Sequence, residues 1–281
     1  MKVKRKLFCE LCPFTYTVSL HKERWKRNIK DLFGSEKFAK SHQESRLPAI
    51  VYSQHNNMIK RGPGIDPKHQ QNKADNIRIA CNKIDGLLIH PGEVFSFWHT
   101  VGKTSKRNGF SEGRVLINGR LTAGIGGGLC NLANTINLLI LHSPLTITEL
   151  HHHSDALAPD PNGHHVPYSA GTSVNYNFID YRFRNDTDQV VQLCTWCEGD
   201  ELMAELRSEH PYPYTYRLTE EGHHFHKEDD GTFYRYSIIY KETLEHDAET
   251  DDYKVVKREL SWDNRSKVYF DAALIPNEQI K

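Results

Sequence analysis

A glycine cluster that runs directly into an apolar periodic segment constrains this chain more than any other feature. Residues 124–141 read GIGGGLCNLANTINLLIL, and their apolar side chains recur at spacings of three and four. This spacing predicts a helix with one face in a hydrophobic core. The glycines before it can adopt backbone angles that are closed to other residues. Cys130 would then lie in the first turn, where unpaired N–H groups and the helix dipole favour a thiolate.

Length and composition indicate one large or two small globular domains. The chain has 281 residues, 38% of them hydrophobic, and a mean hydropathy of −0.64. It contains no run of about 18 apolar residues that could span a membrane, and residues 9–16 are too short and mixed for a signal peptide. We therefore expect a cytoplasmic protein whose six cysteines stay reduced.

The zero net charge conceals opposite charges at the two ends of the chain. Residues 1–45 hold eleven Lys and Arg against five Asp and Glu, whereas residues 210–281 hold ten against fifteen. Within the basic end, residues 20–45 fit an amphipathic helix. Four apolar side chains form its stripe: Trp25, Ile29, Leu32 and Phe33. We expect this stripe to pack on the rest of the protein, with a peripheral membrane contact as the alternative.

The remaining patterns predict an α+β fold, with an antiparallel sheet packed around the central buried helix. A second helix is expected at 71–85, with Cys81 on its buried stripe. Asn118-Gly119 predicts a hairpin between two short strands, and residues 173–183 fit one long strand. We divide the chain into a basic N-terminal helical segment (1–46), an α+β domain (47–209) and a small β appendage (210–281).

Several motifs resemble the VanW proteins, a bacterial family. They include PGEVFSFW at 91–98, GIGGGLC at 124–130, His153-Ser154 and DYRFRNDT at 180–187, and the likeness runs from about residue 91 to 208. The family is named for an accessory gene that accompanies some vancomycin-resistance clusters, and no reaction is assigned to it. The resemblance therefore implies a link to cell-wall biology or glycopeptide resistance.

Two positions depart from the pattern common in that family. Asn131 stands where many members have glutamine, and Thr172-Ser173 stands where many have Asp-Ala. If that aspartate orients a catalytic group in other members, this chain has to function without it.

Cys130, His153 and Asp180 could form a catalytic set. The thiol needs a base to become a thiolate, and a third polar group would hold the imidazole. His153 follows a predicted strand, and Asp180 on the next strand, or Asp155 beside the histidine, could orient it. Such a set is typical of cysteine hydrolases and acyl transferases, which here would act on an amide or peptide-like substrate.

A non-catalytic ligand- or partner-binding module, with Cys130 structural, is the alternative. Cys130, Asn134 and Asn137 share a helix face separate from the leucines, and buried amides need hydrogen-bond partners. N–H groups after the glycines could bind a ligand or form an oxyanion hole. The residues that we expect at such a pocket are Gly126, Gly127, Gly128, Asn131, Asn134 and Ser154.

Metal and nucleotide sites are less favoured. In the pair Cys194/Cys197, residues three apart in a strand point to opposite faces, and Cys9/Cys12 lacks a knuckle glycine. His153 with His165 and a carboxylate is a weaker zinc candidate, because seventeen histidines make chance clusters common. The chain has no P-loop. We predict no metal, no cofactor and no nucleic acid, and a ligand that is a small molecule or a peptide-like cell-wall precursor.

Overall fold

The structure, a computed structural model, describes residues 7–61, 66–117, 120–152, 155–156, 171–247 and 251–281. Its α-helices are α1 Pro13–Phe33, α2 Pro67–Ile84, α3 Phe97–Val101 and α4 Leu129–Leu141. Short 3-10 turns lie at η1 Phe8–Glu10, η2 Lys106–Asn108, η4 Ala272–Leu274 and η5 Asn277–Gln279. The strands are β1 Ala49–Asn57, β2 Leu87–Ile89, β3 Val94–Ser96, β4 Glu112–Ile117, β5 Arg120–Ile125, β6 Thr146–Glu149, β7 Asp155–Ala156, β8 Arg182–Arg184, β9 Val191–Glu198, β10 Glu201–Ser208, β11 Tyr214–Lys227, β12 Phe233–Asp247 and β13 Asp252–Val268.

The strands form separate sheets that are almost wholly antiparallel. One sheet has the order β1-β10-β9-β2, the C-terminal sheet has the order β11-β12-β13-β7, and a smaller one has the order β3-β8-β6. β4 and β5 form a hairpin, as predicted, with Ile117 opposite Arg120. Only the short β13–β7 pair among the described strands is parallel. The α+β class is therefore confirmed.

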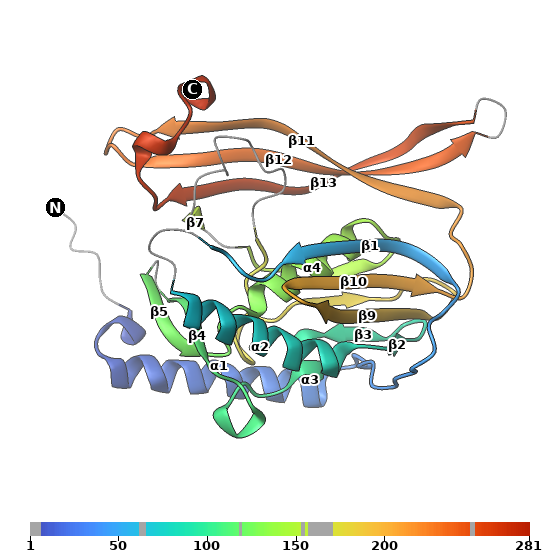
Figure 1. Ribbon diagram of the computed structural model, residues 1–281, viewed down its shortest axis with the longest axis horizontal. Helices are drawn as coiled ribbons and strands as arrows, with labels where there is room; N and C mark the ends of the chain where they lie inside the picture. Colours follow the sequence, from blue (N-terminus) through green and yellow to red (C-terminus); the bar gives the residue numbers. More distant parts are fainter. Residues whose placement is uncertain (1–6, 62–65, 118–119, 153–154, 157–170, 248–250) are drawn as a thin grey trace.

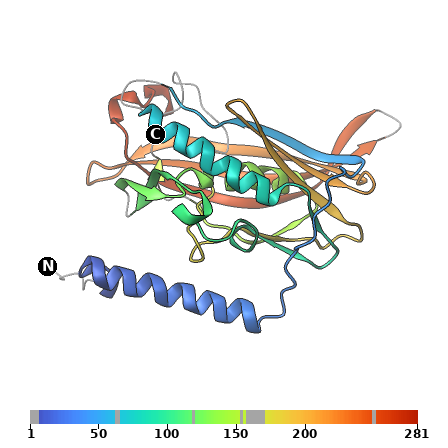
Figure 2. The same cartoon turned by 60° about the horizontal axis from the view of Figure 1, so that its bottom comes forward.

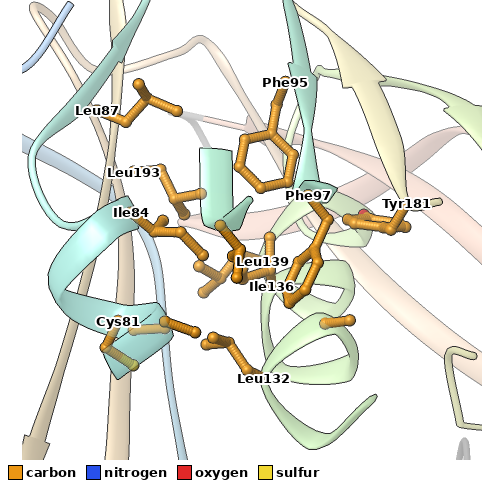
Figure 3. Close-up of a cluster of buried hydrophobic side chains, with 14 of the residues drawn as sticks. Cys81, Ile84, Leu87, Phe95, Phe97, Leu132, Ile136, Leu139, Tyr181 and Leu193 are labelled. Carbon is orange, nitrogen blue, oxygen red and sulfur yellow. The ribbon is translucent and has the colours of Figure 1, made fainter. Parts of the chain in front are cut away.

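Helix α4 is the central buried helix that the sequence predicts. It packs against β1, β10 and α2, and the fully buried Leu132, Ile136 and Leu139 point into the main core. Figure 3 shows these side chains beside Cys81 and Ile84 of α2. Cys81 is buried there, as its place on the apolar stripe of that helix predicts.

The far end of α4 contacts the C-terminal sheet. Leu141 packs with Leu218 of β11, Ile239 of β12 and Trp262 of β13 in a second apolar cluster. Figure 1 shows this sheet as a layer of long strands on the side of α4 away from α1. The strands of the appendage extend well beyond the short runs that the sequence predicts there, and β11 was not predicted.

The predicted strand at 173–183 is mostly a turn. The chain bends between Asn175 and Ile179, where the backbone N–H of Ile179 donates to the Asn175 carbonyl at 3.0 Å. Asn177 has a φ of 48°, a left-handed conformation that asparagine tolerates better than most residues. Of the predicted range, only Arg182 and Phe183 lie in a strand, β8. The turn preference of the asparagines therefore outweighs the apolar alternation.

Helix α1 contradicts the expected packing of its apolar stripe. It begins at Pro13, earlier than predicted, and ends before Gly34. Trp25 and Phe33 are 69% and 81% exposed, and Leu32 is 75% exposed. Figure 2 shows the helix lying along the outside of the molecule. None of the described helices is both long enough and apolar enough to cross a membrane.

Candidate functional site

The glycine cluster forms a tight connection between β5 and α4. Gly128 is the N-cap of α4 and has a φ of 100°, while Gly126 has a φ of 82°. Both values lie in the region that residues with a side chain rarely adopt. A Cβ on Gly128 would also lie 2.3 Å from Cγ of Lys73, and one on Gly126 would lie 2.8 Å from Cγ2 of Thr104. The glycines are thus required by backbone shape and by close approach.

A buried asparagine of α2 forms hydrogen bonds to the backbone of this connection. Asn76 donates from Nδ2 to the carbonyl oxygens of Gly127 at 3.0 Å and Ser111 at 3.1 Å. Its Oδ1 accepts from the backbone N–H of Ser111 at 2.8 Å. Every hydrogen-bonding group of this amide except one lone pair is therefore used, and the start of α4 is held rigidly on α2.

Cys130 lies half-buried in the first turn of α4, as predicted. Its Sγ donates a hydrogen bond to the Val174 carbonyl, with sulfur and oxygen 3.7 Å apart. Burial raises the pKa of the Cys130 thiol above its ordinary value. The desolvation thus outweighs the helix dipole, and the group is a protonated thiol at neutral pH.

The asparagines on α4 bind neighbouring segments. Oδ1 of Asn131 accepts from Nδ2 of Asn56 in β1 at 2.8 Å. Oδ1 of Asn134 accepts from the backbone N–H of Thr172 at 3.3 Å. Asn137 is buried, and its Oδ1 has no hydrogen-bond partner among the described residues. Asn131 and Thr172, the two departures from the family pattern, therefore both take part in contacts around α4.

Asp180 lies in a buried network at the start of α3. Its Oδ2 accepts from Ser96 Oγ at 2.6 Å and from Arg182 Nε at 2.7 Å. Its Oδ1 accepts from the backbone N–H groups of Trp98 at 3.1 Å and Tyr181 at 2.9 Å. These contacts give the carboxylate a structural task in capping α3 and neutralising a buried arginine.

His153, the proposed base of the predicted catalytic set, lies outside the described residues. Ser154 and His165 of the weaker zinc candidate also lie outside them. Asp155 is described only through its place in β7. The Cys130–His153–Asp180 set stays a prediction. Among the described residues, no group of three or more His, Cys, Asp or Glu side chains could hold a metal ion.

Lys73 is a residue that the sequence did not mark. Its aliphatic stem lies over Gly128. Burial, reinforced by repulsion from Lys60, lowers the pKa of Lys73 to about 8. Within the described residues its ammonium has neither a hydrogen bond nor an ion pair. No motif surrounds it in the sequence, so only the contact with the glycine reveals it.

The fold and the glycine-capped central helix define an α+β protein. Residues 72–207 match the family model described as VanW like protein, so the resemblance inferred from the motifs is confirmed. That range includes most of α2, all of α4 and β9, and the residues of the candidate site other than Asn56 and Lys60.

Two curated proteins are similar to this chain. The vancomycin B-type resistance protein VanW of Enterococcus faecalis is 28% identical over 202 residues, which cover 72% of this chain and 73% of that protein. The uncharacterized protein YoaR of Bacillus subtilis is 25% identical over 138 residues, 49% of this chain and 44% of YoaR. The match thus spans less than half of YoaR. No solved structure matches the chain.

Proposed function

We propose that this protein is an accessory protein in vancomycin-type glycopeptide resistance, and that its VanW-like domain binds a ligand without catalysing a reaction. The similarity to VanW of Enterococcus faecalis supports the first part. The state of the Cys130 thiol carries the second part, because its S–H group donates a hydrogen bond to the Val174 carbonyl and so stays protonated.

A cysteine nucleophile reacts as the thiolate, so an enzyme of this kind lowers the pKa of its thiol. Burial instead raises the pKa of Cys130. A carbonyl oxygen as partner stabilises the protonated form, because only the thiol has a proton to donate. Cys130 then serves to hold the segment around Val174 against the start of α4.

The charges beside the start of α4 support a ligand with a negative group. Lys73 and Lys60 repel one another, and an anion between them would relieve that repulsion while raising the pKa of Lys73 again. A peptide-like cell-wall precursor with a free carboxylate has the required charge. We therefore propose such a precursor as the ligand class.

Alkylation of the thiols across pH tests the non-catalytic role. Iodoacetamide labelling followed by peptide mass spectrometry should give Cys130 a half-maximal rate above about pH 8.5, the ordinary thiol value. Cys12 is the internal control, because hydrogen bonds from the backbone and hydroxyl of Thr15 lower its pKa. Labelling of Cys130 at a lower pH than Cys12 would contradict the proposal and favour the cysteine hydrolase or acyl transferase.

Calorimetric titration tests the ligand. A cell-wall stem peptide with a free terminal carboxylate should bind, whereas the same peptide with an amidated terminus should bind at least about tenfold more weakly. Lys73→Met should remove this preference, and the matched control Lys254→Met on β13, an exposed lysine far along the chain, should keep it. Equal binding of the two peptides by the unaltered protein would refute the carboxylate ligand.

A further inference from the structure

Helix α1 is attached to the body of the protein by its polar side. Among the described residues, its polar attachments are made by side chains in the C-terminal half of the helix, and Arg24 also lies over the Tyr176 ring. The pairs are Arg24 Nε with the Tyr176 carbonyl at 3.0 Å, Arg27 with Glu149 at 2.6 Å, Asn28 with Asn177 at 2.6 Å and Asp31 with Arg182 at 2.7 Å.

The apolar side chains of α1 face away from these attachments. At about 100° per residue, the apolar stripe lies roughly 120° around the helix from the attached side. No residue of α1 is fully buried. The stripe predicted from Trp25, Ile29, Leu32 and Phe33 also includes Phe14 and Val18. Leu7, Phe8 and Leu11 extend the exposed apolar surface beyond the N-terminus of the helix.

A row of lysines borders the stripe on the side away from the body. Lys22, Lys26 and Lys30 are spaced by four residues and are exposed, so they form a line along one flank. Lys26 pairs with Glu23 at 2.9 Å, whereas Lys22 and Lys30 have no ion pair within the described residues. The acidic Asp31 is turned toward the body, where it pairs with Arg182.

The charge on the side of the molecule opposite α1 has the other sign. Residues 210–281 contain ten Lys and Arg against fifteen Asp and Glu. The sheet that they form lies on the side of the molecule opposite α1 (Figure 1). An anionic surface would therefore attract the α1 side and repel the C-terminal sheet.

We propose that α1 docks this protein on an anionic lipid surface. The apolar stripe enters the boundary between headgroups and acyl chains, and the lysine row lies among the headgroups. An apolar face rich in Trp, Phe and Leu beside a row of lysines is the composition of helices that lie in this interface. A protein partner would need its own acidic row and apolar groove, whereas a bilayer supplies both over any length of helix.

Vesicle co-sedimentation of the full chain tests the proposal. We expect binding to vesicles of phosphatidylcholine with phosphatidylglycerol, little binding to phosphatidylcholine alone, and release by salt. Trp25 fluorescence should shift to shorter wavelength on binding, since Trp25 is the most exposed of the four tryptophans. Trp25→Glu with Leu32→Glu should lower the partition coefficient by about tenfold or more.

Matched controls separate the helix face from general effects. Ile50→Glu alters a side chain that is 54% exposed on β1, so it should leave vesicle binding unchanged. Lys22→Glu and Lys30→Glu should each weaken binding ~5-fold or more, whereas Lys254→Glu changes the net charge equally and should not. Unaltered far-ultraviolet circular dichroism would show that each variant folds.

Two results would overturn the proposal. One is that the unaltered protein fails to sediment with anionic vesicles at low salt. The other is a concentration-dependent dimer in analytical ultracentrifugation that Trp25→Glu with Leu32→Glu abolishes, because the stripe would then be the interface of a second copy. Both outcomes leave the ligand proposal for the VanW-like domain untouched, since that site lies on α2 and α4.

Discussion

Helices α4 and α1 both carry an apolar stripe, yet they use it in opposite ways. In α4 the stripe fills the core, with Leu132, Ile136 and Leu139 fully buried. In α1 the stripe is in solvent and the charged side is attached, through Asp31 and its neighbours. The comparison teaches that periodicity identifies a helix face and leaves open what covers it. The decisive difference is the surface that each helix meets, which is apolar for α4 and charged for α1.

Substitution of Arg182, which pairs with Asp31 of α1, should have the largest effect on stability. Arg182 is only 2% exposed, and Arg182→Met would leave the Asp31 and Asp180 carboxylates without their cation. We expect the free energy of unfolding to fall by about 3–5 kcal/mol, because an uncompensated buried charge is costly. Urea unfolding measures this. The matched control Arg184→Met removes a surface pair with Asp186 and should cost no more than about 1 kcal/mol.

Truncation of one leucine in each helix tests the comparison directly. Leu139→Ala in α4 should lower the free energy of unfolding by about 2–5 kcal/mol, because it opens a cavity in the core. Leu32→Ala in α1 should change it by less than about 0.5 kcal/mol, because that side chain is 75% exposed and leaves no cavity. Equal losses in the two urea titrations would mean that the α1 stripe is covered in solution.

Asp31 of α1 is paired with Arg182, whereas Lys73 of α2, beside the start of α4, has no ion pair within the described residues. Burial lowers the pKa of Lys73, above the start of α4, to about 8. Its unfolded value is near 10.4, so the unfolded chain binds more protons between these values and stability rises with pH there. Lys73→Met should stabilise the protein at pH 7 by roughly 1–3 kcal/mol.

The pH dependence of unfolding provides the check on that lysine. Lys241 has a pKa lowered to about 8 by the same burial effect, so Lys73→Met should reduce the rise in stability between about pH 8 and 10.4 without abolishing it. Thermal melts at several pH values measure the slope. A variant with the slope of the unaltered protein would show that Lys73 is solvated and that its charge is not strained.

Local sequence patterns predicted the fold well where a segment carried a single clear signal, such as a turn pair or a helical spacing of apolar residues. The Asn118-Gly119 pair predicted the hairpin, and the spacing of leucines predicted α4 and its burial. The strand predicted at 173–183 was wrong because Asn175 and Asn177 favour a turn. The division at residues 46 and 209 and the cytoplasmic location stay predictions.

The candidate site was harder to predict, because its contacts join distant residues. Cys130 and the glycines were visible as a motif. Lys73 reaches Gly128 across 55 positions of sequence, and Val174 reaches Cys130 across 44. No local pattern records such approaches, and the burial that raises the pKa of Cys130 depends on them.

The attachment of α1 should depend on pH in a way that α4 does not share. Burial alone would raise the pKa of Asp31, but hydrogen bonds from His99 and Arg182 outweigh it and hold the pKa well below its usual range. A depressed folded pKa means that this carboxylate stabilises the fold fully above about pH 4, and that its contribution is lost as pH falls further. Hydrogen-exchange protection factors of α1 amides should therefore be constant from pH 7 to about pH 4 and drop below it, whereas those of α4 should persist. Asp31→Asn should give the low protection already at pH 7, and a high value in that variant would mean that the other polar contacts hold α1 without it.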